Sequence, residues 1–211
     1  MSRVRTRPTR DDTCEKLFEA AARVFEEQGI GGASIEAIAA AAGFTRGAFY
    51  SNFKSKDELI IAMLEDHVAQ SIRRNLDLLA RHKNLADFID ALKTMDRSRQ
   101  DPLGRSPLLH MEMILFVARA EKRRPDLAQR LQARRKLITD IVEITLKNSG
   151  KNGSLNPTWT GAIVLALEDG FRLHRLIDPE TTPADSFLRA ISDLQRAMGL
   201  SSGLSSGISS A

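Results

Sequence analysis

The sequence predicts an all-α fold of about nine helices, with a small N-terminal domain followed by a larger helical domain. Apolar residues recur at steps of three and four, as in Leu17, Ala21, Val24 and Phe25, which is the period of one helix face. No segment alternates between apolar and polar residues as a half-buried strand does. Of the 211 residues, 42% are hydrophobic and 27% are charged, so the chain can bury a core of its own.

Capping residues and loop-forming residues divide the chain into these helices. We expect helices to begin near residues 10, 34, 45, 56, 85, 107, 125, 158 and 183. The predicted N-caps are Ser34, Thr45, Asn156 and Thr182, and Ser55 with Glu58 forms a capping box. The fourth helix, from Lys56 to about Arg81, should run roughly 39 Å at about 1.5 Å per residue, which is enough to link two domains.

A window near residue 50 gathers aromatic and basic side chains. Four of the eleven aromatic residues lie in GFTRGAFYSNFKSKDEL (residues 43–59), together with three cations. Two short predicted helices, residues 35–42 and 46–52, are separated here by three residues that begin with Gly43. Helices this short are unstable in isolation, so packing of their apolar faces has to hold them. The pattern indicates a helix-turn-helix, although a compact helical corner of a core would share it.

Two stretches of this region carry a family resemblance. They are AARVFEEQGIGGASIEAIAAAAGFTRGAFYSNFKSKDELI and, as its most specific part, AFYSNFKSKDEL. They resemble the DNA-binding domain of the TetR family of repressors over roughly residues 9–64. In the C-terminal half, LEDGFRLHRLIDP (residues 167–179) is also similar to the family. The resemblance implies a homodimeric transcriptional regulator, a repressor that a small-molecule ligand releases from a palindromic DNA operator.

The resemblance also implies which residues contact DNA. Ser34 and Lys56, at the starts of two helices, correspond to phosphate contacts, since a helix N-terminus favours an anion. Tyr50 corresponds to a tyrosine whose hydroxyl reaches a phosphate. The base-facing positions are Thr45, Arg46, Gly47 and Ala48, and Asn52 and Lys54 are expected to contact the DNA backbone or bases. Gly47 and Ala48 lack polar side chains, so we expect Arg46 and Thr45 to carry most of the hydrogen-bonded readout.

The last two predicted helices carry apolar stripes at heptad-like spacing. These stripes are Ile163, Leu167, Gly170, His174 and Ile177 on one helix, and Phe187, Ile191 and Leu194 on the next. Gly170 weakens a helix by about 1 kcal/mol relative to alanine, so close approach of another backbone is a reason for its presence. The stripes suggest an antiparallel four-helix interface between two copies of the chain, and a core within one chain is the alternative.

The resemblance further implies an apolar effector pocket in the larger domain. Its expected lining residues are Phe88, Leu92, Met95, His110, Met113, Phe116, Ile141, Val142 and Trp159, although periodicity alone would place them in a core. The predicted domains are residues 1–57 (an Arg-rich arm and the helix-turn-helix), residues 58–199 (effector binding and dimerisation), and a flexible tail at 200–211.

Other sequence features exclude some classes of protein. Cys14 is the only cysteine, so no disulfide can form within the chain. The four histidines are scattered without a metal-binding spacing, no nucleophile motif is present, and we expect neither a cofactor nor an enzyme. The longest uncharged apolar run is too short to span a membrane, so we expect a cytoplasmic protein with no membrane partner. An all-α enzyme and a ligand-blind architectural DNA-binding dimer are the alternatives.

Overall fold

The structure is a computed structural model of the full chain, and it describes residues 10–82, 85–94, 102–119, 121–151, 153 and 155–200. The Arg-rich arm, Met95 and the tail after Leu200 lie outside the described residues.

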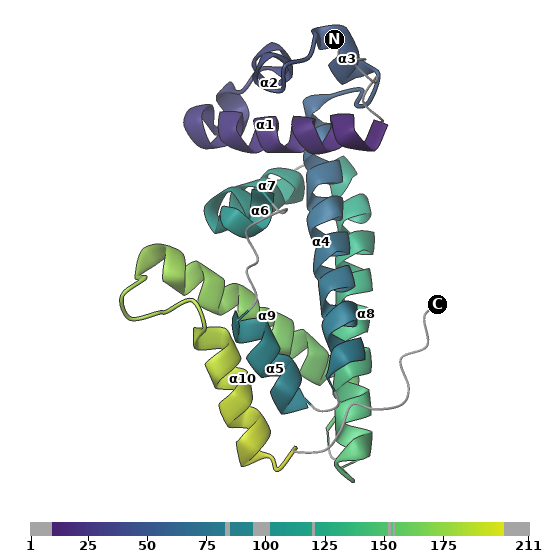
Figure 1. The fold of residues 1–211 in the computed structure, drawn as a ribbon, viewed down its shortest axis with the longest axis vertical. Helices are drawn as coiled ribbons and strands as arrows, with labels where there is room; N and C mark the ends of the chain where they lie inside the picture. Colours follow the sequence, from purple (N-terminus) through teal and green to yellow (C-terminus); the bar gives the residue numbers. More distant parts are fainter. Residues whose placement is uncertain are drawn as a thin grey trace, which may run out of the picture. The chain divides into compact units, whose positions relative to one another are not determined.

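The described residues form α-helices and one 3-10 helix, without a strand, which confirms the all-α prediction (Figure 1). The elements are α1 (Arg10–Gly32), α2 (Ile35–Ala41), α3 (Arg46–Tyr50), α4 (Lys56–Arg81), α5 (Leu85–Thr94), α6 (Pro102–Arg105), α7 (Pro107–Arg119), η1 (Glu121–Arg123), α8 (Arg124–Asn148), α9 (Pro157–Ile177) and α10 (Ser186–Ala197). Each of the nine predicted starts corresponds to a helix that begins within three residues of it, and the four-residue α6 is additional.

Most of the predicted caps are present. The side chains of Ser34, Thr45 and Asn156 each accept a hydrogen bond from a backbone N–H three residues later. Ser55 accepts from the N–H of Glu58, whose carboxylate accepts in turn from the N–H of Lys54 at 2.7 Å.

The N-cap prediction for Thr182 was wrong. Helix α10 begins at Ser186, after a turn in which the N–H of Ser186 donates to the carbonyl of Pro183. Asp185 takes the N-cap position and makes no capping hydrogen bond with its side chain. Because of this turn, helix α10 begins three residues after Pro183.

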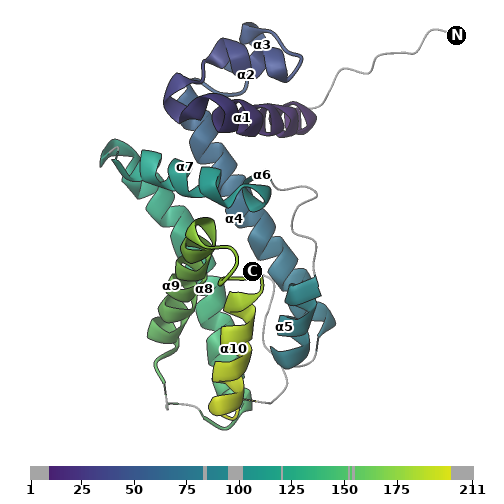
Figure 2. The same ribbon diagram turned by 90° about the vertical axis from the view of Figure 1, so that its left-hand side faces the viewer.

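The chain consists of two compact units. The first contains residues 1–67 and 98–127, and the second contains residues 68–97 and 128–211, so that α4 supplies residues to both. The first unit includes the whole region from α1 to α3, in which α2 packs against both α1 and α3 (Figure 2).

The core of the first unit is built on α1. Leu17 and Phe25 of this helix are almost fully buried, as are Ile38 of α2 and Phe49 of α3. The helix is interrupted at Gly29, which has a φ of 70° that other residues rarely adopt. This interruption turns the chain toward α2.

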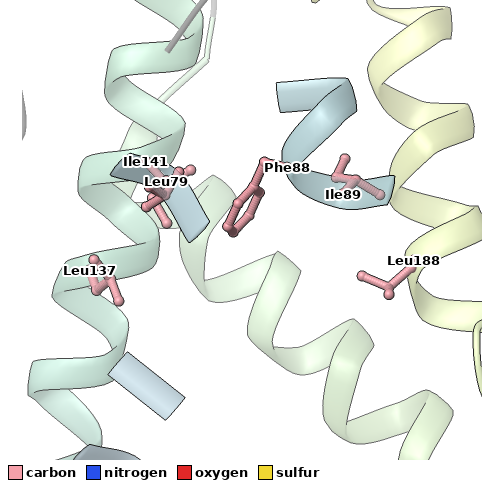
Figure 3. Packing of buried hydrophobic residues seen from close by; sticks show 6 residues of the cluster. All are labelled: Leu79, Phe88, Ile89, Leu137, Ile141 and Leu188. Atoms are coloured by element: carbon pink, nitrogen blue, oxygen red, sulfur yellow. The ribbon is translucent and has the colours of Figure 1, made fainter. Parts of the chain in front are cut away.

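The core of the second unit joins four helices. Leu79, Phe88, Ile89, Leu137, Ile141 and Leu188 form one buried cluster contributed by α4, α5, α8 and α10 (Figure 3). Helix α9 packs closely on α8 at Gly161, where a Cβ atom would lie 2.8 Å from the Oγ1 of Thr139 and 3.2 Å from its Cα. A side chain at position 161 would therefore force the two helices apart.

A charge network also links α8 and α9. One oxygen of Glu168 binds Arg134 at 2.6 Å, and the other binds Arg172 at 3.0 Å. All three side chains are largely buried, with exposures of 14–18%. Desolvation raises the pKa of the neighbouring Asp169, and the two guanidiniums act in the opposite direction. One carboxylate thus bridges two cations that α8 and α9 bring together.

Candidate DNA-binding interface

The turn between α2 and α3 has the geometry that its glycine predicts. Gly43 has a φ of 74°, and the N–H of Phe44 donates to the carbonyl of Ala39 at 2.8 Å, which closes the end of α2. Helix α3 then begins at Arg46 and ends at Tyr50, two residues earlier than predicted. The two helices are thus joined by a tight turn, as in a helix-turn-helix.

Aromatic packing holds α3 in place. Phe49 is completely buried and Phe53 is 6% exposed, and their ring centroids lie 5.9 Å apart. Phe53 also contacts Phe18 of α1 at 5.9 Å, and Tyr50 meets the edge of Phe49 at 5.7 Å. A helix of five residues has no stability of its own, so these contacts account for its presence.

The outer side of α3 presents the predicted base-facing residues. Thr45, Arg46 and Gly47 are exposed, while Ala48 is half-buried and Tyr50 is 42% exposed. Arg46 carries the long hydrogen-bond donor of this surface. Its Nη1 lies 2.9 Å from a carboxylate oxygen of Glu36 in α2, and its Nη2 donates to the hydroxyl of Tyr50 at 3.4 Å.

The electrostatics of Arg46 follow from these two neighbours. The hydrogen bond to Tyr50 and the charge of Glu36 both raise the pKa of its guanidinium, which lies at the surface. The guanidinium carbon also lies 5.4 Å from the centroid of the Tyr50 ring, within the range of a cation–π contact. Arg46 is therefore a fixed positive charge on the open face of α3.

Two of the predicted DNA contacts are engaged within the protein. The amide nitrogen of Asn52 donates to the carbonyl of Ala48 at 2.9 Å, and its oxygen accepts from the thiol of Cys14 at 3.7 Å. Burial raises the pKa of that thiol. The ammonium of Lys56 donates to the carbonyls of Ile30 and Ala33 at 2.7 and 2.8 Å.

The remaining predicted contacts lie at the surface. Ser34 is exposed at the start of α2, where its hydroxyl accepts from the N–H of Ala37, and Lys54 is exposed between α3 and α4. Ser34, Lys54 and the residues of α3 all belong to the first unit.

The predicted dimerisation stripes lie largely at the surface of the second unit. Ile163 is 57% exposed, Ile177 is 78% exposed and Leu194 is 46% exposed. His174 is also exposed, whereas Leu167, Phe187 and Ile191 are half-buried. No atom would lie within 4 Å of a Cβ atom at Gly170, so nothing among the described residues requires a glycine there.

The predicted pocket residues fall into two groups. Phe88 and Ile141 are buried in the core of the second unit, with Leu92 packed against it, and Val142 is half-buried. Trp159 of that unit is 71% exposed. In the first unit, His110 and Met113 are buried and Phe116 is half-buried. The rings of His110 and His67 are in contact, with centroids 4.4 Å apart and an angle of 55° between their planes.

One residue of this surface, Glu36, was not predicted from the sequence. It lies in the first turn of α2 and reaches Arg46 across the turn, ten positions later. Its position in an otherwise apolar helix, IEAIAAA, was the available signal. Across the described residues, no group of three or more metal-ligating side chains is present, and no helix is long and apolar enough to cross a membrane.

Comparison with known proteins agrees with this geometry. Residues 17–63 match the model of the family described as "Bacterial regulatory proteins, tetR family". Over 91 residues the chain is 36% identical to the HTH-type transcriptional regulator TtgR of Pseudomonas putida. That alignment covers 43% of this chain and 41% of TtgR, so it spans less than half of either protein.

Solved structures resemble the chain over most of its length. The reduced form of E. coli NemR superimposes with a TM-score of 0.66 at 22% identity, covering 86% of this chain and 97% of NemR. FadR from Bacillus subtilis in complex with stearoyl-CoA gives a TM-score of 0.62 at 16% identity, covering 92% and 98%. At these identities the likeness concerns the fold.

The fold and the surface of α3 together define an all-α protein with an N-terminal helix-turn-helix of the DNA-binding type. The family model covers this helix-turn-helix, and the solved structures share the fold of nearly the whole chain. The helix-turn-helix of this chain, residues 17–63, belongs to the TetR family of bacterial regulatory proteins.

Proposed function

We propose that the protein is a homodimeric transcriptional regulator, a repressor that binds a palindromic DNA operator and is released from it by a small molecule. The observation that carries this proposal is the exposed guanidinium of Arg46 on a helix that aromatic packing holds outward. The match of residues 17–63 to the TetR family supports a DNA-binding role for this helix.

In the proposed complex, α3 enters the major groove. Arg46 donates to a base edge there, and guanine is the preferred target because its O6 and N7 both accept. Ser34, Tyr50 and Lys54 face phosphates, which fix the position of the protein but carry no sequence information. Two of the three ammonium N–H groups of Lys56 donate to backbone carbonyls, and we propose that the third donates to a phosphate.

Dimerisation is proposed through α9 and α10. The exposed apolar side chains of Ile163, Ile177 and Leu194 are disfavoured in water, and a second copy would cover them. The open space around Gly170 leaves room for a partner helix to approach closely. Two copies related by a two-fold axis read two half-sites, so the operator is a pseudo-palindrome.

Release by a ligand is proposed to act through the larger domain. FadR, a protein of the same fold, was solved with stearoyl-CoA bound, which supports a small-molecule site in such a domain. Within the second unit, the proposed lining residues are Phe88, Leu92, Ile141 and Val142. A ligand that binds one spacing of the two α3 helices better than another would shift the dimer away from the operator.

Selection of bound sequences from random double-stranded DNA tests the DNA-binding role. The full-length protein should enrich one pseudo-palindromic motif with half-sites about 34–36 Å apart, or a longer helical repeat. Arg46→Ala should lose the preference at one position of each half-site. Glu26→Ala, on the exposed surface of α1, is the control and should leave the motif unchanged. Failure of the wild-type protein to enrich any motif would contradict the proposal and favour the architectural alternative.

Ligand release is tested on the selected operator. Stearoyl-CoA and shorter acyl-CoAs are the first probes, followed by a library of small apolar compounds, with fluorescence anisotropy of labelled DNA as the readout. A compound that releases DNA without being consumed supports a regulator. Chemical turnover of the compound would instead favour the enzymatic alternative. Because the target is DNA, the proposed compartment is the cytoplasm.

A further inference from the structure

Glu36, Arg46 and Tyr50 form one connected group on the exposed face of the helix-turn-helix. Glu36 binds Nη1 of Arg46 at 2.9 Å, and the Tyr50 hydroxyl accepts from Nη2 at 3.4 Å. The ring of Tyr50 lies beneath the guanidinium, with 5.4 Å between its centroid and Cζ. Arg46 is therefore attached at both terminal nitrogens and supported on one side.

This attachment leaves Arg46 able to read a base. A guanidinium has five N–H donors, of which Glu36 and Tyr50 engage two, so three remain. A guanine edge requires two of them. The side chains of Arg46 and Glu36 are 63% and 56% exposed, so DNA can approach the group.

Glu36 and Tyr50 fix the direction of the Arg46 side chain before DNA binds. A free arginine side chain loses rotamer freedom when it binds, and a side chain that is already held loses less. Tyr50 lies one turn after Arg46 on the same helix, but Glu36 belongs to α2. The ion pair therefore ties the guanidinium to a second helix, so its direction depends on both.

The charge of Glu36 adds a second effect. A carboxylate on this surface repels the phosphates of any DNA, whatever its sequence. It thus lowers the affinity for all sites while it favours the base that Arg46 faces. Specificity is the difference between two affinities, so the uniform repulsion leaves it unchanged and only the positioning of Arg46 enlarges it.

We propose that Glu36 is a positioning residue that determines specificity, because it holds Arg46 in the one orientation that reads a base. This inference rests on the proposed function, since it requires that α3 reads DNA. Glu36 acts through Arg46 and need not touch DNA itself.

The test measures base discrimination in the full-length protein. Fluorescence anisotropy gives the affinity for the selected operator, for operators changed at each base pair in turn, and for unrelated DNA. The position read by Arg46 is the one at which Arg46→Ala loses its preference. For the wild type, discrimination at that position should be about tenfold to a hundredfold.

Glu36→Ala should reduce discrimination at that position at least threefold and leave the other positions unchanged. It should also strengthen binding to unrelated DNA, because a negative charge is lost. Glu26→Ala removes the same charge from exposed α1 and should leave discrimination intact. Tyr50→Phe keeps the ring but loses the hydroxyl, and should give an intermediate loss.

A double variant separates positioning from a general structural effect. In the Arg46→Ala background, Glu36→Ala should change no position, because the residue through which it acts is absent. The inference is overturned if Glu36→Ala leaves discrimination intact or lowers it at every position. It is also overturned if Glu36→Ala changes discrimination by the same factor in the Arg46→Ala background as in the wild type. If the wild type selects no motif, the proposed function fails as well, and that outcome is distinct from these.

Discussion

Lys56 provides the sharpest test of the helix-turn-helix because its ammonium has two defined partners. It donates to the carbonyls of Ile30 and Ala33, at the end of α1, from the first position of α4. Lys56→Met keeps the aliphatic part of the side chain and removes both hydrogen bonds. We expect this variant to be less stable, and to bind all DNA sequences less tightly.

The size of the destabilisation follows from these two hydrogen bonds. A hydrogen bond from a charged donor contributes about 1.5–3 kcal/mol, so two contribute roughly 3–6 kcal/mol when fully buried. Lys56 is half-buried, and water would satisfy the carbonyls in part, so about half of that is expected. Removing a cation from a helix N-terminus returns about 0.5 kcal/mol. The expected net decrease is about 1–2.5 kcal/mol in the free energy of unfolding.

Urea unfolding followed by far-ultraviolet circular dichroism measures this decrease. Lys54→Met is the matched control, since Lys54 is exposed and should change stability by no more than about 0.5 kcal/mol. DNA affinity against salt gives the second readout, where each phosphate that the protein no longer neutralises flattens the slope by about one. Equal stability of the two variants would refute the view that Lys56 secures the end of α1.

Four further outcomes are expected. Arg46→Ala should lower operator affinity about tenfold to a hundredfold for each half-site and abolish the preference at one position of each half-site, and an unchanged selected motif would contradict this. Gly161→Ala should lower the free energy of unfolding by about 1 kcal/mol, because overpacking against Thr139 outweighs the gain in helix propensity, and Thr139→Ala should partly restore it in urea titrations. Gly170→Leu should weaken the dimer in sedimentation without loss of helix content, and a tight dimer would exclude this interface. The fluorescence of Trp159, which is exposed, should change when a true effector releases DNA, and release without such a change would place the effector elsewhere.

The positions of the helices could be predicted because local residues decide them. Ser34, Thr45 and Asn156 cap their helices with their own side chains, within three residues. Thr182 misled the prediction because a turn at Pro183 comes before the helix. Such a turn depends on the conformation of several residues together, and no single residue type indicates it.

The internal partners of the candidate site could not be predicted in the same way. Lys56 binds two backbone carbonyls, which every residue possesses, so no sequence pattern identifies them. Glu36 and Arg46 meet only because the turn at Gly43 folds α3 back toward α2. The proposed DNA-contact residues of α3 were accessible from the sequence through the resemblance of this segment to the TetR family.

The five-residue length of α3 has a consequence for engineering this protein. Because Phe49 and Phe53 hold the helix, a synthetic peptide of residues 45–53 would lose its shape and could not compete for an operator. The exposed positions 46 and 47, by contrast, contribute little to folding. New target sequences can therefore be sought by randomising these two positions in the intact protein, with the N-cap Thr45 and both phenylalanines kept.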